Sequence, residues 1–304
     1  MAADFDGFGE PFTLSLPLDG AGGARVPFVF NSPHSGRRYP PSFHAMTRLD
    51  NLSIRKSEDY LVDELFADVV ALGAPLLAAN FPRAWLDVNR EPYELDPVMF
   101  SEALPAFANT RSVRVSGGLG TIARIVSERE EIYNRKLTVA EGLERIERYY
   151  KPYHERLRTL LAKAIARFGH AVLVDCHSMP SASAFSRRAR NWSARADFVV
   201  GDRYGSSCSP ALTHAATDFL KGRGYRVALN KPYAGGFITS HYGRPGHGLH
   251  AIQIEVNRGL YMDEVRMRKS SGFDRLRRDL TDLADHMISL PSTDLAGETP
   301  LAAE

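Results

Sequence analysis

Polar residues that are suited to chemistry cluster at four points of the sequence, each of which follows a short apolar run. The four clusters are residues 32–36, 87–90, 175–178 and 255–258. In open α/β sheets, ligands bind beyond the carboxyl ends of the strands. We therefore expect these four clusters to meet at one edge of a sheet and to form a single site.

Two of the clusters contain a histidine, His34 or His177. Two histidines and one carboxylate, with a fourth position open to water, are the usual ligands of a catalytic zinc ion. The carboxylate is expected from Asp59, with its neighbour Glu58 as the reserve. Alternatively, each histidine is only a hydrogen-bonded loop residue. The hypothesis is one zinc ion per chain, bound by His34, Asp59 and His177.

Glu255 ends an apolar run that is typical of a buried strand, where burial raises the pKa of a carboxyl group. In zinc hydrolases such a carboxylate takes a proton from water and passes it to the leaving nitrogen of an amide. We predict Glu255 as the catalytic base, and a strand-end ion pair with Arg258 is the alternative. Asp175, two residues before His177, is placed to orient that ring.

Three arginines near the predicted strand ends favour an anionic substrate, because a guanidinium group pairs bidentately with a carboxylate. They are Arg83, Arg90 and Arg258. Asn89 directly precedes Arg90, and the two side chains together are suited to hold one carboxylate. The alternative for each arginine is a solvated surface position.

A glycine-rich region with tyrosines and histidines spans residues 230–248. It is predicted to be a lid or a substrate-binding loop that includes Gly236 and Tyr242, since glycine permits close backbone approach. The alternative is a long irregular connection. Three histidines in this region or just after it are set aside as metal ligands in favour of the strand-end pair: His241, His247 and His250.

Other chemistries are disfavoured by the sequence. It contains neither a P-loop nor a dinucleotide-binding glycine motif after a strand. Ser35 and Ser178 lack the context of a nucleophile elbow, and Cys176 directly follows the strand predicted at 171–175 and has the flanking residues of a strand position, so covalent catalysis is not expected.

The composition is that of an ordinary globular protein, with 304 residues, 44% hydrophobic and 24% charged. The net charge of +2 does not suggest a nucleic-acid surface or a polybasic membrane anchor. No apolar run approaches the roughly 20 residues that span a bilayer, and the acidic N-terminus does not resemble a secretory signal. With two cysteines in unrelated contexts and no disulfide framework, the prediction is a cytoplasmic protein. Nothing in the composition indicates an oligomeric state.

The elements that must position these residues alternate between short strands and amphipathic helices. Helices are predicted at residues 59–72, 138–168, 210–221 and about 261–290. The second begins with a capping box of Thr138 and Glu141, and Pro152 is expected to kink or divide it. Strands are predicted at 26–30, 75–79, 85–88, 171–175, 197–200, 225–229 and 251–255.

This alternation predicts a single α/β domain with three layers, α/β/α, around a mixed, mostly parallel sheet. The domain would span residues 1–304 as one catalytic unit. Residues 1–24 would form an N-terminal extension and residues 291–304 a loose tail.

The sequence resembles the N-formylglutamate amidohydrolase family over residues 26–290. The matching motifs occur in order: Ser-Pro-His-Ser-Gly at 32–36, Glu-Asp at 58–59 before a helix at 62–66, Asp-Val-Asn-Arg at 87–90, Asp-Cys-His-Ser at 175–178, Asn-Lys-Pro-Tyr at 230–233, Gly-Gly at 235–236, His-Tyr-Gly at 241–243 and the run 250–262.

The resemblance implies a phosphorylase/hydrolase-like fold similar to zinc carboxypeptidases and aspartoacylase. It implies zinc-dependent hydrolysis of N-formyl-L-glutamate to formate and L-glutamate, the last step of one route of histidine degradation. The partner would be a small acidic N-acyl amino acid, with neither nucleic acid nor membrane involved. The alternatives are a related deacylase or amidase for another N-acyl amino acid, or a non-catalytic dicarboxylate-binding protein.

The resemblance also implies roles for individual residues. His34 and His177 would be zinc ligands and Glu255 the catalytic carboxylate. Arg83 would polarise the scissile carbonyl, and Arg90 with Asn89 would clamp the α-carboxylate. Two further arginines are candidates for reading the side-chain carboxylate: Arg258 and Arg244.

One position departs from the wider carboxypeptidase pattern. Those enzymes take a second ligand three residues after the first histidine, whereas Arg37 stands at that place. The carboxylate ligand must therefore come from elsewhere, which leads again to Glu58 or Asp59.

Overall fold

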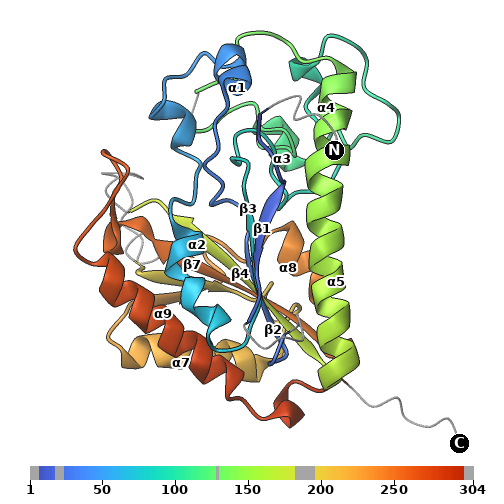
Figure 1. Cartoon of the computed structure of the whole chain (residues 1–304). Coiled ribbons are helices and arrows are strands. Elements are labelled where there is room, and N and C mark those ends of the chain that lie inside the picture. Colours follow the sequence, from blue (N-terminus) through green and yellow to red (C-terminus); the bar gives the residue numbers. More distant parts are fainter. Residues whose placement is uncertain (1–6, 18–23, 128–129, 182–195, 298–304) are drawn as a thin grey trace, which may run out of the picture. The chain divides into compact units, whose positions relative to one another are not determined.

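The computed structural model describes residues 7–17, 24–127, 130–181 and 196–297. Its central feature is a seven-stranded sheet in the order β1-β3-β2-β4-β7-β5-β6 (Figure 1). The strands are β1 Phe12–Ser15, β2 Phe28–Ser32, β3 Leu76–Ala79, β4 Ala171–Met179, β5 Phe198–Gly201, β6 Val227–Leu229 and β7 Leu249–Asn257. β4 is parallel to both β2 and β7, and β5 is parallel to β6 but antiparallel to β7. The predicted mixed, mostly parallel sheet is confirmed.

The chain divides into two units by the density of its contacts. Unit 1 comprises residues 1–13, 33–60 and 78–157, and unit 2 comprises residues 14–32, 61–77 and 158–304. The chain crosses from one unit to the other inside β1 and β3 and directly after β2. The prediction of one catalytic domain over residues 1–304 stays a prediction.

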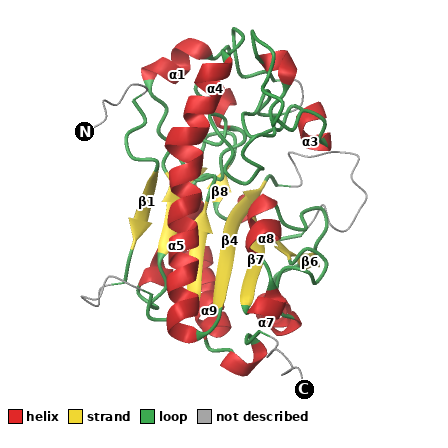
Figure 2. Ribbon diagram, turned by 90° about the vertical axis from the view of Figure 1, so that its right-hand side faces the viewer, coloured by secondary structure: helices red, strands yellow, loops and turns green. Residues whose placement is uncertain are grey.

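In unit 2, helices cover both faces of the sheet, so the three-layer prediction is confirmed. The helices α7 (Pro210–Gly222) and α9 (Phe273–Ile288) pack against each other, and α2 (Val62–Leu65) packs against α9 and β4. On the other face lie α8 (Phe237–Tyr242), which contacts β4 and β7, and the part of α5 that belongs to this unit (Figure 2).

Shorter elements complete unit 2. They are the 3-10 helices η2 Ala67–Val70, η6 Pro245–His247, η7 Arg258–Leu260 and η8 Ser292–Asp294, and a two-stranded sheet of β8 Met262–Asp263 and β9 Arg268–Lys269.

Unit 1 has little regular structure apart from one long helical run. The run begins as α4 (Val139–Arg145), passes through a π-helical turn at Ile146–Tyr150 and continues as α5 (Lys151–Phe168), whose last residues belong to unit 2. The predicted capping box of Thr138 and Glu141 begins it. The other elements of unit 1 are α1 Pro41–Met46, α3 Val113–Ser116, η1 Ser53–Arg55 and η3 Pro97–Met99.

Several predicted elements are wrong. Residues 85–88 form turns rather than a strand, since their backbone bonds go to surrounding loops. The helix predicted at 59–72 begins only at Val62, because Leu61 has a φ of 59° in the left-handed region, which a regular helix excludes, and it is divided at Phe66 into α2 and η2. The helix predicted at 261–290 begins only at Phe273, because β8 and β9 occupy residues 262–269. The kink or division predicted at Pro152 lies beside a change of helix type, since the π-turn at Ile146–Tyr150 ends directly before α5 begins at Lys151.

The two ends of the chain were only partly predicted. The expected extension, residues 1–24, contains β1, which is an edge strand of the sheet. Residues 1–6, 18–23 and 298–304 lie outside the described part of the chain. In the part that the structure describes, no helix has the length and apolar character needed to cross a membrane. The cytoplasmic location stays a prediction.

Both cysteines, Cys176 and Cys208, are free and buried. Burial raises the pKa of the Cys176 thiol well above its ordinary value, and the nearby charge of Asp175 raises it further. A thiol with so high a pKa is a poor nucleophile.

Candidate active site

A row of buried polar side chains lies on one face of the sheet in unit 2. The parallel register aligns Asn31 of β2 with Asp175 of β4, and Asp175 with Gln253 of β7. Two residues further along, His177 of β4 lies beside Glu255 of β7. Since side chains alternate between the two faces of a strand, all five point to the same face. The proximity of a histidine and a carboxylate therefore follows from the register of these two strands.

His177 is oriented by Asp175, as the sequence predicted. The Nε2 of His177 lies 2.9 Å from Oδ2 of Asp175, and the other oxygen, Oδ1, accepts a hydrogen bond of 2.7 Å from Nδ2 of Asn31. Asp175 is fully buried and His177 is 3% exposed. This contact fixes the ring and directs Nδ1 away from Asp175. One detail differs from the prediction, because β4 runs on to Met179, so His177 lies within the strand rather than beyond it.

Glu255 is likewise fixed by a residue two positions earlier in its strand. Its Oε1 accepts a hydrogen bond of 2.8 Å from Nε2 of Gln253, and Oε1 of Gln253 accepts one of 3.0 Å from the backbone N–H of Gly236. Gly236 directly precedes α8. The glycine-rich region is thus partly helical and is bonded to the strand that carries Glu255.

A close backbone contact with β5 also holds the glycine-rich region in place. A Cβ on Gly201 would lie 2.7 Å from the carbonyl carbon of Ala234, so only glycine allows β5 to meet this backbone. Tyr242 ends α8 and is buried, whereas Arg244 follows it at the surface. Burial raises the pKa of Tyr242.

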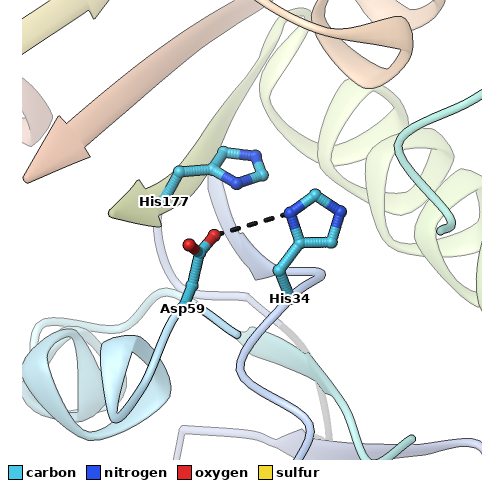
Figure 3. A group of neighbouring side chains, drawn as sticks. All are labelled: His34, Asp59 and His177. Carbon is cyan, nitrogen blue, oxygen red and sulfur yellow. Dashed lines mark ion pairs between the residues drawn. The ribbon is translucent and has the colours of Figure 1, made fainter. Parts of the chain in front are cut away.

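In unit 1, His34 and Asp59 are joined twice. The backbone N–H of Asp59 donates to the carbonyl of His34 at 3.0 Å, and Nδ1 of His34 lies 3.5 Å from Oδ2 of Asp59 (Figure 3). Both residues are 2% exposed. Gly36 fixes the turn, because a Cβ there would come within 2.0 Å of the carbonyl oxygen of Phe81.

The reserve ligand Glu58 is engaged elsewhere. Its two carboxylate oxygens accept a bidentate pair of 2.9 Å bonds from Arg55, and Oε2 also accepts a bond of 3.0 Å from the hydroxyl of Tyr39. The structure therefore favours Asp59 over Glu58 as a ligand.

Asp87 orients His34, a role that the sequence reasoning missed. Its Oδ1 lies 2.7 Å from Nε2 of His34 and also accepts the backbone N–H of Asn89 at 2.8 Å, while Oδ2 accepts a bond of 2.9 Å from Nε of Arg83. Burial raises the pKa of Asp87, but the charge of Arg90, the contact with His34 and the charge of Arg83 outweigh it and hold that pKa well below its ordinary value. The available signal was the Asp-x-Asn motif, which is typical of a side chain that caps its own turn.

The long helical run of unit 1 holds the irregular segment that carries Asp87, Asn89 and Arg90. Three of its side chains bind backbone carbonyls of this segment. The pairs are Arg145 with Trp85 at 3.1 Å, Tyr150 with Arg90 at 2.7 Å and His154 with Val88 at 2.8 Å.

The π-turn explains the spacing of these three side chains. In a regular α-helix, position 149 rather than 150 would lie on the face of Arg145. The extra residue of the π-turn brings Tyr150, and then His154, onto that face.

The remaining predicted residues lie in several environments. Arg90 donates from Nε to the carbonyl of Leu119 at 3.0 Å, and burial lowers the pKa of its guanidinium to about 10. Arg258 donates from Nε to Ser178, whose side chain follows His177 and so points to the opposite sheet face. The roles of Arg83, Asn89, Arg90, Arg258, Arg244, Tyr242 and Gly236 in substrate binding or catalysis stay predictions.

The three histidines set aside earlier differ from His34 and His177. His250 uses both ring nitrogens, since Nδ1 accepts from the backbone of Ser209 and Nε2 lies 2.8 Å from the carbonyl of Leu295. His241 and His247 are exposed. None of the three joins a group of candidate metal ligands among the described residues.

These features define the class of the molecule: an α/β protein whose central strands carry buried histidine and carboxylate side chains of the kinds that hydrolases use. The sequence pattern of the N-formylglutamate amidohydrolase family matches residues 26–262, and the chain belongs to this family. The family resemblance is thereby confirmed.

Three relatives illustrate the likeness. N-formylglutamate deformylase of Pseudomonas aeruginosa is 29% identical over 245 residues, covering 79% of this chain and 84% of the relative. The protein of the same name from Pseudomonas putida is 28% identical over 247 residues, with the same two coverages. The crystal structure of N-formylglutamate amidohydrolase from Ralstonia eutropha is 39% identical, with a TM-score of 0.84 and coverages of 91% of this chain and 97% of that chain.

Proposed function

We propose that the chain is a metal-dependent amide hydrolase that converts N-formyl-L-glutamate and water to formate and L-glutamate. The observation that carries the proposal is the register in which His177, a proposed metal ligand, lies beside Glu255, the proposed base. The substrate is inferred from the names of the relatives, two of which are N-formylglutamate deformylases.

The proposed metal ligands are His34, Asp59 and His177. Each histidine directs Nε2 to its own carboxylate, Asp87 or Asp175, which leaves Nδ1 as the coordinating atom. The 3.5 Å between His34 Nδ1 and Asp59 Oδ2 is too long for a good hydrogen bond. The separation would suit two side chains that hold one metal ion together.

Chain continuity supports a contribution from His177 to the same ion. His34 follows the end of β2 by two residues, and Asn31 of β2 is hydrogen-bonded to Asp175, the residue that orients His177. Two imidazoles and one carboxylate, with a position left for water, match the donor set of catalytic zinc sites.

Held by these residues, such an ion would supply Lewis-acid chemistry, which makes water more acidic and polarises a carbonyl group. Glu255 accepts a proton from the attacking water and delivers it to the nitrogen of glutamate as the C–N bond breaks. Arg83 donates to the oxygen that gains negative charge.

The remaining residues bind the substrate. Arg90 and Asn89 hold its α-carboxylate, and Arg258 or Arg244 reads its side-chain carboxylate. Gly236 and Tyr242 belong to the loop that binds the substrate.

The test combines metal analysis with release of formate from N-formyl-L-glutamate before and after chelation. The proposal expects one zinc ion per chain and formate release that stops on chelation and returns with zinc. Zinc without formate release would indicate that the substrate is another N-acyl amino acid. Assays with acetyl and longer acyl groups would then identify it. Neither metal nor activity would favour a non-catalytic dicarboxylate-binding protein. The cytoplasmic setting and a place in histidine degradation remain predictions of the sequence.

A further inference from the structure

Gln253 lies between the proposed base and the substrate loop and bonds to both. It is 4% exposed and occupies β7 two residues before Glu255. One end of its amide meets the backbone of Gly236 and the other meets Glu255.

The orientation of this amide is determined by its partners. A backbone N–H can only donate a hydrogen bond, so the group that faces Gly236 must be the oxygen Oε1 of Gln253. The Nε2 group therefore faces Glu255 and donates to its Oε1 at 2.8 Å. A donor at this place suits a carboxylate and leaves Oε2 as the oxygen that is not committed to Gln253.

We propose that Gln253 is a positioning residue that holds Glu255 ready to accept a proton and ties it to the loop that binds the substrate. The inference rests on the proposed function, in which Glu255 is the base. Gly236 directly precedes α8, and α8 packs against β7, so an ordered loop and an oriented carboxylate are held by the same amide. Loss of the Gln253 amide should therefore slow the chemical step more than it weakens substrate binding.

Two substitutions separate the two ends of the amide. Gln253→Met removes both hydrogen bonds at nearly constant volume. Gln253→Glu retains an acceptor for Gly236 but replaces the donor to Glu255 by a second carboxylate. The two carboxylates either repel each other or share one proton, and a shared proton occupies an oxygen of Glu255.

The control is Ser207→Ala. Ser207 is 1% exposed and donates from Oγ to the carbonyl of Ala251 at 2.7 Å, so it supports the same strand without bonding to Glu255. It reports what the loss of one buried hydrogen bond near β7 does to activity through stability alone.

The experiment measures kcat and KM for N-formyl-L-glutamate at equal zinc content, with the melting temperature of each variant. We expect kcat to fall about 10- to 100-fold in Gln253→Met and at least as much in Gln253→Glu, with KM changing less than about threefold. Ser207→Ala should keep kcat within about twofold. A small change of kcat in Gln253→Met, a loss matched by Ser207→Ala, or a Gln253→Glu variant with full kcat would each overturn the inference.

A second measurement does not depend on activity. Hydrogen exchange at the backbone of residues 234–242 should speed up in Gln253→Met but stay close to wild type in Gln253→Glu, which retains the acceptor. Unchanged exchange in Gln253→Met would overturn the link to the loop. A wild-type protein without formate release would instead contradict the proposed function, so the two failures are distinguishable.

Discussion

His177 and His34 have the same side chain and the same kind of partner, but different parts of the fold hold them. His177 lies inside β4, and its neighbours are set by a strand register that runs from Ala171 to Met179. His34 lies in a turn after β2, where Gly36 meets the carbonyl of Phe81 and the N–H of Asp59 meets the carbonyl of His34. One position depends on a regular ladder and the other on a few specific contacts.

The orienting carboxylates show the same difference. Asp175 precedes His177 by two residues, so strand alternation alone places both on one face. Asp87 is 53 residues away from His34 and lies in an irregular segment. That segment is held by side chains of the helical run of unit 1, among them Tyr150 and His154. The comparison teaches that the strand-borne part of the site is supported locally and the loop-borne part from a distance.

The largest effect is expected from Glu255→Gln, which changes the chemistry of the strand-borne part but not its shape. Activity should fall about 10²- to 10⁴-fold because the general base is lost. Zinc content and melting temperature should change little, since the new amide oxygen still accepts from Gln253. Glu64→Gln, at a surface ion pair with Lys269, is the matched control and should remain fully active. Substantial activity in Glu255→Gln would remove Glu255 from its proposed role.

The next effect compares the two carboxylates directly. Asp87→Asn and Asp175→Asn should each weaken zinc binding about 10- to 100-fold, because each orients a proposed ligand. Asp87→Asn should also lower the free energy of unfolding by about 1.5–3 kcal/mol, since it removes charged hydrogen bonds. Asp175→Asn should lower the free energy of unfolding by less, because the new side chain can still accept the hydrogen bond from Asn31. Zinc titration and urea unfolding measure both, and equal losses of stability would break the comparison.

A moderate effect is expected from Tyr150→Phe, which tests support from a distance. The variant leaves the carbonyl of Arg90 without its hydroxyl partner, which should cost about 1–3 kcal/mol of stability. Because Arg90 is proposed to hold the substrate, KM should rise several-fold while zinc affinity is retained. Tyr225→Phe removes a hydroxyl that bonds to Asp279 in unit 2 and serves as the control. An unchanged KM would show that the segment is held without Tyr150.

The smallest effect concerns the start of that helical run. The hydrogen bond from Arg135 and the capping contact with Thr138 lower the pKa of Glu141 from 4.5 to about 2, although burial opposes them. Since the folded-state pKa is depressed, the stabilisation is present above about pH 4.5 and is lost as the pH falls toward 2.

Glu141→Gln keeps the capping acceptor but removes the charge. Its side chain is 32% exposed in the wild type, so solvent screening should limit the difference to less than about 1 kcal/mol at pH 7. Urea unfolding of both proteins from pH 7 to pH 2.5 should show the difference shrinking. A difference that grows on acidification would contradict the assigned shift.

Much of the fold and part of the site could be predicted from the sequence. The strands around Val172 and Ile252 are continuous apolar runs, which report burial on both faces within a few residues. Alternation within such a run already places Asp175 and His177 together. The capping box at Thr138 is equally local, because both partners lie within one turn.

Only the tertiary structure decided the rest. It placed Asp87 on His34, engaged Glu58 with Arg55 and so favoured Asp59, and aligned Glu255 with His177. It also showed that residues 85–88, apolar enough for a strand, are turns held by a distant helix. The physical reason is that propensity and alternation act over a few residues, whereas these contacts join segments far apart in the chain and exist only once the sheet register and the π-turn bring them together.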